Sequence, residues 1–142
     1  MDLYSPVILE LNSSATNYVK DSGASHQVKA YNTFCGDKFL ISFNHDGTLK
    51  DVTFHGYGCA VSKASTALMT EIISGKSLQD VAQMCKQVLA YLDGENDEAL
   101  DLDDRIASFG VVKKYPGRYD CAALCWSEML KYSESASEPT SP

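Results

Sequence analysis

The sequence predicts an α+β domain in which a small three-stranded antiparallel sheet is covered by helices. Two observations carry this prediction: strand-like alternation of apolar residues lies between residues 26 and 54, and helical spacing of apolar residues dominates from residue 59 onward. The 142 residues suit one domain, and 44% hydrophobic content is enough for a core. We expect this domain to span 1–132 and the Ser-, Glu- and Pro-rich tail, 133–142, to be disordered.

The N-terminal segment predicts a short helix. Ser5 is a typical N-cap and Pro6 a typical first-turn residue. Apolar side chains then recur at helical spacing, at Tyr4, Val7, Ile8 and Leu11. The polar stretch 12–25 fits either a loop or a frayed helix end, and the pattern does not separate the two.

Three strand-like segments come next. Residues 26–31 alternate weakly, whereas Phe39, Ile41 and Phe43 alternate cleanly. Residues 44–47, Asn-His-Asp-Gly, predict a turn that leads to a third strand containing Leu49, Val52 and Phe54. We therefore predict a hairpin plus one further strand, with residues 34–37 as a connecting loop between the first two strands.

Two longer helices follow the strands. Gly56-Tyr57-Gly58 ends the third strand, and a helix begins at or near Cys59 and stops near Gly75. Ser77 resembles the N-cap of the next helix. The apolar stripe of that helix is complete at helical spacing: Leu78, Val81, Ala82, Cys85, Val88, Leu89 and Leu92.

The sequence of the C-terminal third predicts two more helices, which follow a run of acidic residues. The acidic run, 93–104, favours a solvated linker over a partner-docking patch. Apolar spacing at Leu102, Ile106 and Phe109 predicts a short helix, and a last helix is expected over about 118–132.

Composition excludes several functions. A net charge of −7 argues against nucleic-acid binding, which needs clustered Lys and Arg. No run of 18 apolar residues exists, so no membrane span is expected. Residues 1–6 lack the basic start and apolar stretch of a signal peptide, which predicts a cytoplasmic protein. Thiols stay reduced in that compartment, so an odd count of five cysteines favours metal or sulfur chemistry over disulfides.

Three of the cysteines have distinctive surroundings. Cys35 is followed by Gly36, which allows a tight turn and an accessible thiol, and Asp37 can reach the same ion. Cys59 follows a Gly-x-Gly sequence at a predicted helix start, where free amides and the helix dipole stabilise a thiolate. Cys121 falls in the first turn of the last predicted helix.

Charged neighbours and the remaining candidates weigh less. Arg118 would lower the pKa of Cys121, whereas Asp120 would oppose that effect or compete as a ligand. Cys85 lies in an apolar helical stripe and is interpreted as core. Cys125 is one turn beyond Cys121; core is favoured there too, with a reserve ligand role left open. The histidines, including His55 beside the glycine pair, are interpreted as structural.

Cys35, Asp37, Cys59 and Cys121 thus form a candidate four-ligand metal site. Three thiolates and a carboxylate around a divalent ion leave an excess of two negative charges, which nearby Lys63 and Arg118 would offset. Structural zinc usually takes only Cys and His, and a hard carboxylate among thiolates is a more replaceable ligand. The set therefore predicts a site that releases one ligand, with Cys35 as the thiol that leaves and reacts.

These residues resemble the NifU N-terminal/IscU/SufU family of iron–sulfur assembly proteins. The resemblance covers about residues 26–130. The segments that carry it are Asn32-Thr33-Phe34-Cys35-Gly36-Asp37, Phe54-His55-Gly56-Tyr57-Gly58-Cys59-Ala60-Val61-Ser62-Lys63-Ala64-Ser65, Met69-Thr70 and Gly75-Lys76. The family fold, SufE/NifU-like, agrees with the class predicted from the patterns.

Within the family, the chain is similar to the SufU type. IscU-type members carry a histidine directly before the third cysteine and a Leu-Pro-Pro-Val-Lys stretch, and neither is present. An inserted acidic segment precedes Lys114-Tyr115-Pro116-Gly117-Arg118 instead, and Cys121-Ala122-x-Leu124-x-Trp126 follows. The resemblance implies a zinc site on Cys35, Asp37, Cys59 and Cys121, and persulfide sulfur accepted at Cys35.

Three departures from the family pattern bear on this implication. The usual Asn-Pro-x-Cys is Asn32-Thr33-Phe34-Cys35, so the loop lacks the stiffness of proline. The His-x-x-x-Pro-Arg-Asn stretch after the first helix is missing, which puts partner docking by that region in doubt. Asp120 stands where a basic residue is common.

Three functions follow as hypotheses. In the first, the chain is a zinc-dependent sulfurtransferase that takes persulfide sulfur from a SufS-like cysteine desulfurase and passes it to a downstream iron–sulfur scaffold or to apo-proteins. In the second, it is a scaffold on which an iron–sulfur cluster is assembled and transferred, the same ligands holding iron. The third is a structural zinc domain that mediates protein contacts; the asymmetric ligand set favours it least.

Overall fold

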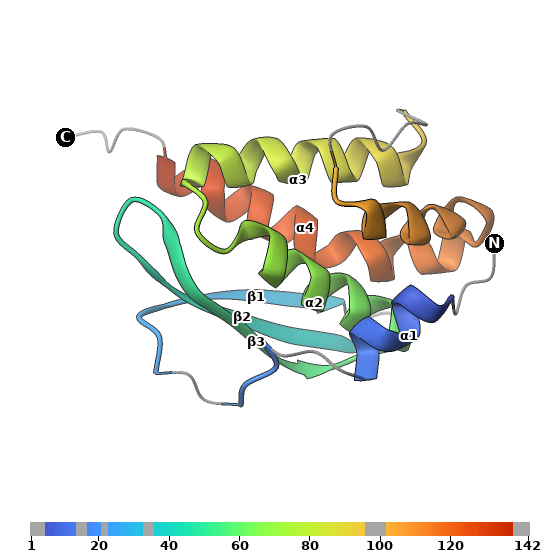
Figure 1. Cartoon of the computed structure of the whole chain (residues 1–142), viewed down its shortest axis with the longest axis horizontal. Coiled ribbons are helices and arrows are strands. Elements are labelled where there is room, and N and C mark those ends of the chain that lie inside the picture. The colour runs from blue at the N-terminus through green and yellow to red at the C-terminus, as the bar shows by residue number, and fades with distance from the viewer. Residues whose placement is uncertain (1–4, 14–16, 21–22, 33–35, 96–101, 138–142) are drawn as a thin grey trace.

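The computed structural model describes residues 5–13, 17–20, 23–32, 36–95 and 102–137 (Figure 1). Its elements are α1 (Pro6–Ser13), β1 (His26–Asn32), β2 (Asp37–His45), β3 (Leu49–Tyr57), α2 (Ala60–Ile73), α3 (Leu78–Asp93), the 3₁₀ helix η1 (Asp104–Lys114) and α4 (Pro116–Ser137). The predicted α+β class, a three-stranded antiparallel sheet covered by helices, is confirmed.

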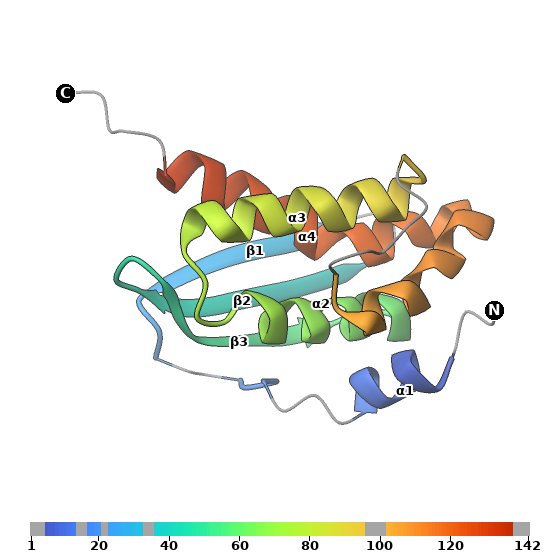
Figure 2. The ribbon, with the colours of Figure 1, turned by 45° about the horizontal axis from the view of Figure 1, so that its top comes forward.

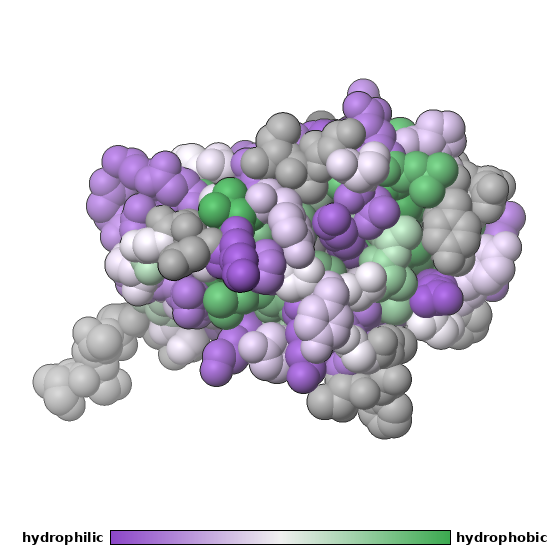
Figure 3. Space-filling model, turned by 90° about the horizontal axis from the view of Figure 1, so that it is seen from below, coloured by the Kyte–Doolittle hydropathy of each residue, from purple (hydrophilic) through white to green (hydrophobic). Residues whose placement is uncertain are grey.

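The sheet has the strand order β1-β2-β3 and one buried face. Ile41 in the central strand pairs with Val28 on one side and Phe54 on the other, and all three side chains are buried. The opposite face carries exposed side chains such as Lys29 and Lys38, and it is mostly hydrophilic (Figure 3). The helices therefore cover a single face of the sheet, as the alternating pattern requires.

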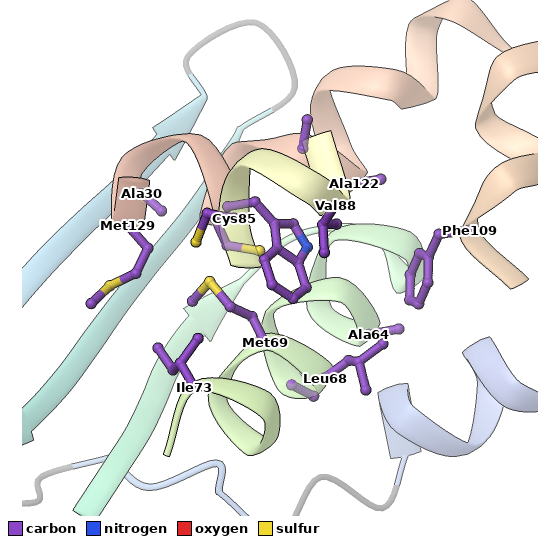
Figure 4. Close-up of a cluster of buried hydrophobic side chains, with 14 of the residues drawn as sticks. Ala30, Ala64, Leu68, Met69, Ile73, Cys85, Val88, Phe109, Ala122 and Met129 are labelled. Carbon is purple, nitrogen blue, oxygen red and sulfur yellow. The ribbon is translucent and has the colours of Figure 1, made fainter. Parts of the chain in front are cut away.

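Helices α2 and α4 lie directly on this buried face, with α4 over β1 and α2 over β3. Helix α3 packs on α4 at the side away from the sheet (Figures 1 and 2). Figure 4 shows the core between them, where Met69 of α2, Cys85 of α3 and Met129 of α4 share one cluster with Ala30 of β1. The interpretation of Cys85 as a core residue is confirmed.

The described part of the polar stretch 12–25 combines the two alternatives that the sequence left open. Residues 12–13 end α1, and residues 17–20 and 23–25 form a loop with one isolated bridge. Tyr18 forms a parallel bridge with Phe54, flanked by 2.9 Å hydrogen bonds from Val19 N to the Phe54 carbonyl and from Phe54 N to the Asn17 carbonyl. The Asn17 amide also donates to Thr70 Oγ1 of α2 at 3.3 Å. This short extended segment satisfies backbone groups on the open edge of β3.

Two boundaries near the C-terminus differ from the prediction. Helix α4 begins at Pro116 instead of Arg118, because proline suits the first helical position. It also continues through residues 133–137, which were expected to belong to a disordered tail, and Ser133 is fully buried. The tail prediction is therefore wrong for 133–137, where polar composition hid a helical face; residues 138–142 lie outside the described residues. None of the helices in the described part is long and apolar enough to cross a membrane.

The predicted short helix is a 3₁₀ helix, and part of the acidic run has a structural role there. Asp103 caps η1: one carboxylate oxygen accepts from Arg105 N at 2.9 Å and from Arg105 Nε at 3.0 Å. The Arg105 side chain holds the pKa of Asp103 below its usual range. The expectation of a solvated linker is wrong for this residue, and residues 96–101 lie outside the described part of the chain.

Candidate metal centre

Asp37, Cys59 and Cys121 each direct one ligand atom to a common point, and these three atoms lie within 4.8 Å of one another. They come from the start of β2, the N-terminal cap of α2 and the body of α4. Sulfur atoms on a tetrahedral zinc ion lie about 3.8 Å apart, given Zn–S bonds of about 2.3 Å. The structure therefore brings three of the four predicted ligands to within reach of a single ion.

Asp37 is almost fully buried, and only one of its carboxylate oxygens is satisfied. Oδ1 accepts from Cys59 N at 3.3 Å and from Ser62 Oγ at 3.2 Å. Oδ2 is buried and has no hydrogen-bond partner among the described residues. Burying an unpaired carboxylate oxygen is costly, so a cation at this position fits the donor set.

The location of Asp37 differs from the prediction. The sequence placed it on the loop between the first two strands, but it is the first residue of β2 and pairs with Asn32. The cause is that pairing continues to the end of the hairpin, where Gly36 takes a positive φ of 74°. The backbone of this candidate ligand is thus fixed by the sheet.

Cys59 is the half-buried N-cap of α2, as the predicted helix start requires. Its Sγ accepts from Ser62 N at 3.4 Å, which is one of the free amides at the start of the helix. Gly58 makes this approach possible, because a Cβ there would stand 2.6 Å from Asp37 Oδ1 and 2.9 Å from the Phe39 ring. The glycine before the cysteine is therefore needed for space.

Cys121 is buried, and it does not lie in the first turn of its helix as predicted. Because α4 begins at Pro116, Cys121 falls in the second turn, beyond the free amides. Burial raises the pKa of the Cys121 thiol, and Cys59 and Asp37 raise it further, whereas Arg118 lowers it. Deprotonation of Cys121 therefore requires additional positive charge, which a bound metal ion supplies.

The other sequence candidates are placed as follows. Cys35 lies outside the described residues, so its position relative to the three ligands stays a prediction. Asp120 is exposed, and Cys125 is buried with its Sγ 3.7 Å from Ser65 Oγ; neither belongs to the three-ligand group. The Lys63 ammonium lies 4.6 Å from the centre of the Tyr18 ring, the same ring that His55 contacts at 5.1 Å.

Ser62 and Ser65 lie within the family segment, but the sequence alone predicted a role for neither. Ser62 contacts two ligands, and Ser65 bonds to α4 beside the third. The available signal was their spacing: they stand three and six residues after Cys59 in the predicted helix, on the face that the apolar pattern buries. Buried hydroxyls on such a face require partners.

Comparison with known proteins agrees with this geometry. Residues 3–122 match the family model of the NifU-like N terminal domain. The chain belongs to this family. Among family relatives, the zinc-dependent sulfurtransferase SufU of Bacillus subtilis is 37% identical over 102 residues, which are 70% of this chain and 69% of SufU. The iron–sulfur cluster assembly scaffold protein IscU of Thermotoga maritima is 29% identical over 138 residues, 96% of each chain.

Solved structures of the NifU-like family share the fold. A SUF-system protein of Fervidobacterium islandicum, described as an iron–sulfur cluster assembly scaffold, superposes with a TM-score of 0.82 at 32% identity, covering 89% of this chain and 93% of that one. A NifU-like N-terminal domain from Brucella abortus gives a TM-score of 0.77 at 16% identity, which supports the fold alone. The resemblance stated from the sequence motifs is confirmed.

Proposed function

We propose that this protein is an iron–sulfur cluster assembly protein of the SufU type that accepts persulfide sulfur from a cysteine desulfurase. The observation that carries the proposal is the convergence of Asp37, Cys59 and Cys121, together with the buried Asp37 Oδ2, which has no hydrogen-bond partner among the described residues. The similarity to the zinc-dependent sulfurtransferase SufU supports it. The desulfurase partner, the downstream scaffold or apo-protein acceptors and a cytoplasmic location belong to the same proposal.

Cys35 would accept the sulfur. Its thiolate attacks the terminal sulfur of the persulfide on the desulfurase cysteine, and a new sulfur–sulfur bond forms as the donor bond breaks. The donor cysteine leaves as a thiolate, so the exchange needs no oxidant or reductant. Cys35 suits this task because in the sequence it stands between the end of β1 and the start of β2, next to Gly36, which has a positive φ.

Cys59, Cys121, Asp37 and Cys35 would hold the metal. When bound, zinc supplies positive charge that keeps the thiols deprotonated at neutral pH. The three described ligands belong to three separate elements that are fixed by pairing and packing. The chain itself therefore fixes three proposed ligands, and Cys35, the fourth, is the one proposed to react.

A cysteine-exchange experiment tests the acceptor. The desulfurase, labelled cysteine and each variant are incubated, and label bound to the variant is measured after separation under non-reducing conditions. We expect the wild type and Cys125→Ala to carry label and Cys35→Ala to carry none. Circular dichroism verifies that all three are folded. Label retained on a folded Cys35→Ala variant contradicts the proposed acceptor.

A cluster scaffold is the second candidate, because an IscU scaffold protein matches 96% of the chain. The same ligands can hold iron in an iron–sulfur cluster. Anaerobic reconstitution with iron and sulfide separates the two functions. A stable visible chromophore that transfers to an apo-ferredoxin supports the scaffold, whereas retained zinc with stimulation of the desulfurase supports sulfur transfer.

A further inference from the structure

Two buried serines on α2 contact all three elements that supply the described ligands. Ser62 and Ser65 are one turn apart and each is about 1% exposed. Buried hydroxyl groups are costly unless they are hydrogen-bonded. Ser62 forms a hydrogen bond to the carboxylate of Asp37, and Ser65 forms one to a carbonyl of α4.

Ser62 joins two of the ligands. Its backbone N–H donates to Cys59 Sγ at 3.4 Å, and its hydroxyl lies 3.2 Å from Asp37 Oδ1 and 3.0 Å from the Cys59 carbonyl. A hydroxyl has one proton, so it donates to one of these acceptors at a time. When it donates to Asp37 Oδ1, the Ser62 hydroxyl and the Cys59 N–H together hold the carboxylate of β2 against the first turn of α2.

Ser65 joins α2 to the third ligand. Its hydroxyl donates to the Ala122 carbonyl at 2.6 Å and accepts from Trp126 Nε1 at 2.9 Å. Ala122 is the residue after Cys121, so the first bond fixes the backbone of α4 directly beside that ligand. The second bond joins α2 to Trp126, a buried side chain one turn beyond Ala122 on α4.

We propose that Ser62 and Ser65 are positioning residues that set the separation of Asp37, Cys59 and Cys121 for metal binding. This inference rests on the proposed function, since it assumes that the three groups act as ligands. The serines do not touch the ion. They act through hydrogen bonds to the ligands and to the ligand-bearing helix, as outer-shell partners do in other metal sites.

A third buried hydroxyl on the same helix provides a matched control. Thr70 is fully buried, donates to the Ala67 carbonyl within α2 and accepts from the Asn17 amide. Among the described residues, these two hydrogen bonds of Thr70 reach neither β2 nor α4. Thr70→Val therefore removes a buried hydroxyl, with the attendant loss of stability, and leaves the ligand contacts intact.

The test uses the purified full chain with Co²⁺ as the probe, because its visible bands report ligand number and geometry. Wild type, Ser62→Ala, Ser65→Ala and Thr70→Val are titrated with Co²⁺ alone, then with Zn²⁺ against a chelator, and each is also unfolded thermally without metal. We expect both serine variants to lose about 10- to 100-fold in metal affinity and to shift the visible bands. Thr70→Val should keep the wild-type affinity and spectrum, even where its unfolding temperature falls.

Wild-type affinity and spectra in folded Ser62→Ala and Ser65→Ala overturn the positioning role and leave the metal centre standing. Equal weakening by Thr70→Val also overturns it, because loss of stability then explains the effect. A wild-type chain that binds no Co²⁺ overturns the metal centre itself. The two serine variants are judged separately, so misfolding of one leaves the other to decide.

Discussion

Cys121 and Cys125 lie one turn apart on α4, are both about 1% exposed, and differ in what they face. Cys121 faces Cys59 and Asp37, with Arg118 nearby. Cys125 faces the hydroxyl of Ser65 in the packed interior. Burial therefore does not distinguish a candidate ligand from a core thiol in this protein. The neighbouring groups do, because within the described part of the chain Cys121 belongs to a group of three side chains that could hold a cation, and Cys125 does not.

The largest expected effect separates these two cysteines directly. Cys121→Ala removes one of the four proposed ligands. Structural zinc sites bind with a free energy of about 10–16 kcal/mol, and the loss of about a quarter of it should lower the Zn²⁺ affinity by about 100-fold or more. Cys125→Ala should leave affinity unchanged. Chelator competition with Zn²⁺ measures both.

Comparable Zn²⁺ affinity in the two variants would contradict the distinction between Cys121 as a ligand and Cys125 as a core thiol. A loss confined to Cys125→Ala would show that the ligand set had been assigned to the wrong turn of α4. Circular dichroism of each variant without metal provides the control, since removal of either buried sulfur also costs packing.

A second effect concerns the thiol of Cys125 and should appear at high pH. Burial raises the pKa of Cys125 from its ordinary value of 9.0 to about 11. The folded protein therefore keeps a proton that the unfolded chain loses above about pH 9, so this contribution is full below pH 9 and is lost as pH rises toward 11. Two pKa units correspond to about 3 kcal/mol of unfolding free energy.

Urea unfolding of wild type and Cys125→Ala between pH 8 and 11, with a chelator present, measures this contribution. Other groups with raised pKa values also weaken the fold at high pH, so the difference between the two profiles is the quantity to examine. They include Cys85, Cys121, Tyr119 and Tyr132. The profile of Cys125→Ala should be flatter. Parallel profiles would mean that the thiol titrates alike in the folded and unfolded chain.

Much of this contrast was predictable from the sequence. The Gly-x-Gly-Cys pattern predicted that Cys59 starts a helix, and the apolar stripe predicted that Cys85 is core; both hold in the structure. The placement of Asp37 was not predictable, because hairpin pairing up to Asn32 overrides a local loop signal. The turn that carries Cys121 was missed because a proline two residues before the expected start belongs to the helix.

The role of the serines and the satisfied edge of β3 required the structure for a different reason. Ser65 bonds to Ala122 and Trp126, and Tyr18 bridges to Phe54, each across a long stretch of chain. Helical spacing shows which face of α2 is buried, but it does not show which carbonyl on another element a hydroxyl will meet. Tertiary partners of polar side chains are therefore the part of a site that sequence patterns reveal least.

A smaller effect is expected from a side chain added at Gly58, next to the proposed ligand Cys59. A Cβ added at Gly58 would overlap the Ser62 hydroxyl and stand 2.6 Å from Asp37 Oδ1 and 2.9 Å from the Phe39 ring, so these side chains must move. Overpacking of this kind costs about 1–3 kcal/mol. Gly58→Ala should weaken Zn²⁺ binding, measured by chelator competition. The matched variant Gly117→Ala, with nothing within 4 Å of its Cβ, should leave metal binding unchanged.

The smallest expected effect concerns Cys85, which packs with Met69 and Met129 in the apolar cluster of Figure 4. Burial raises the pKa of its thiol, so it stays protonated and acts as a small apolar side chain. Cys85→Ala should cost about 1 kcal/mol in urea unfolding, and Cys85→Ser somewhat more, about 1–3 kcal/mol, since a hydroxyl there needs a partner. Zn²⁺ affinity should be unchanged in both. A ligand role for Cys85 predicts the opposite result, which is weaker zinc binding without loss of stability. A Cys85→Ser variant that is as stable as the wild type but binds zinc more weakly would therefore contradict the core role and make Cys85 a ligand, like Cys121.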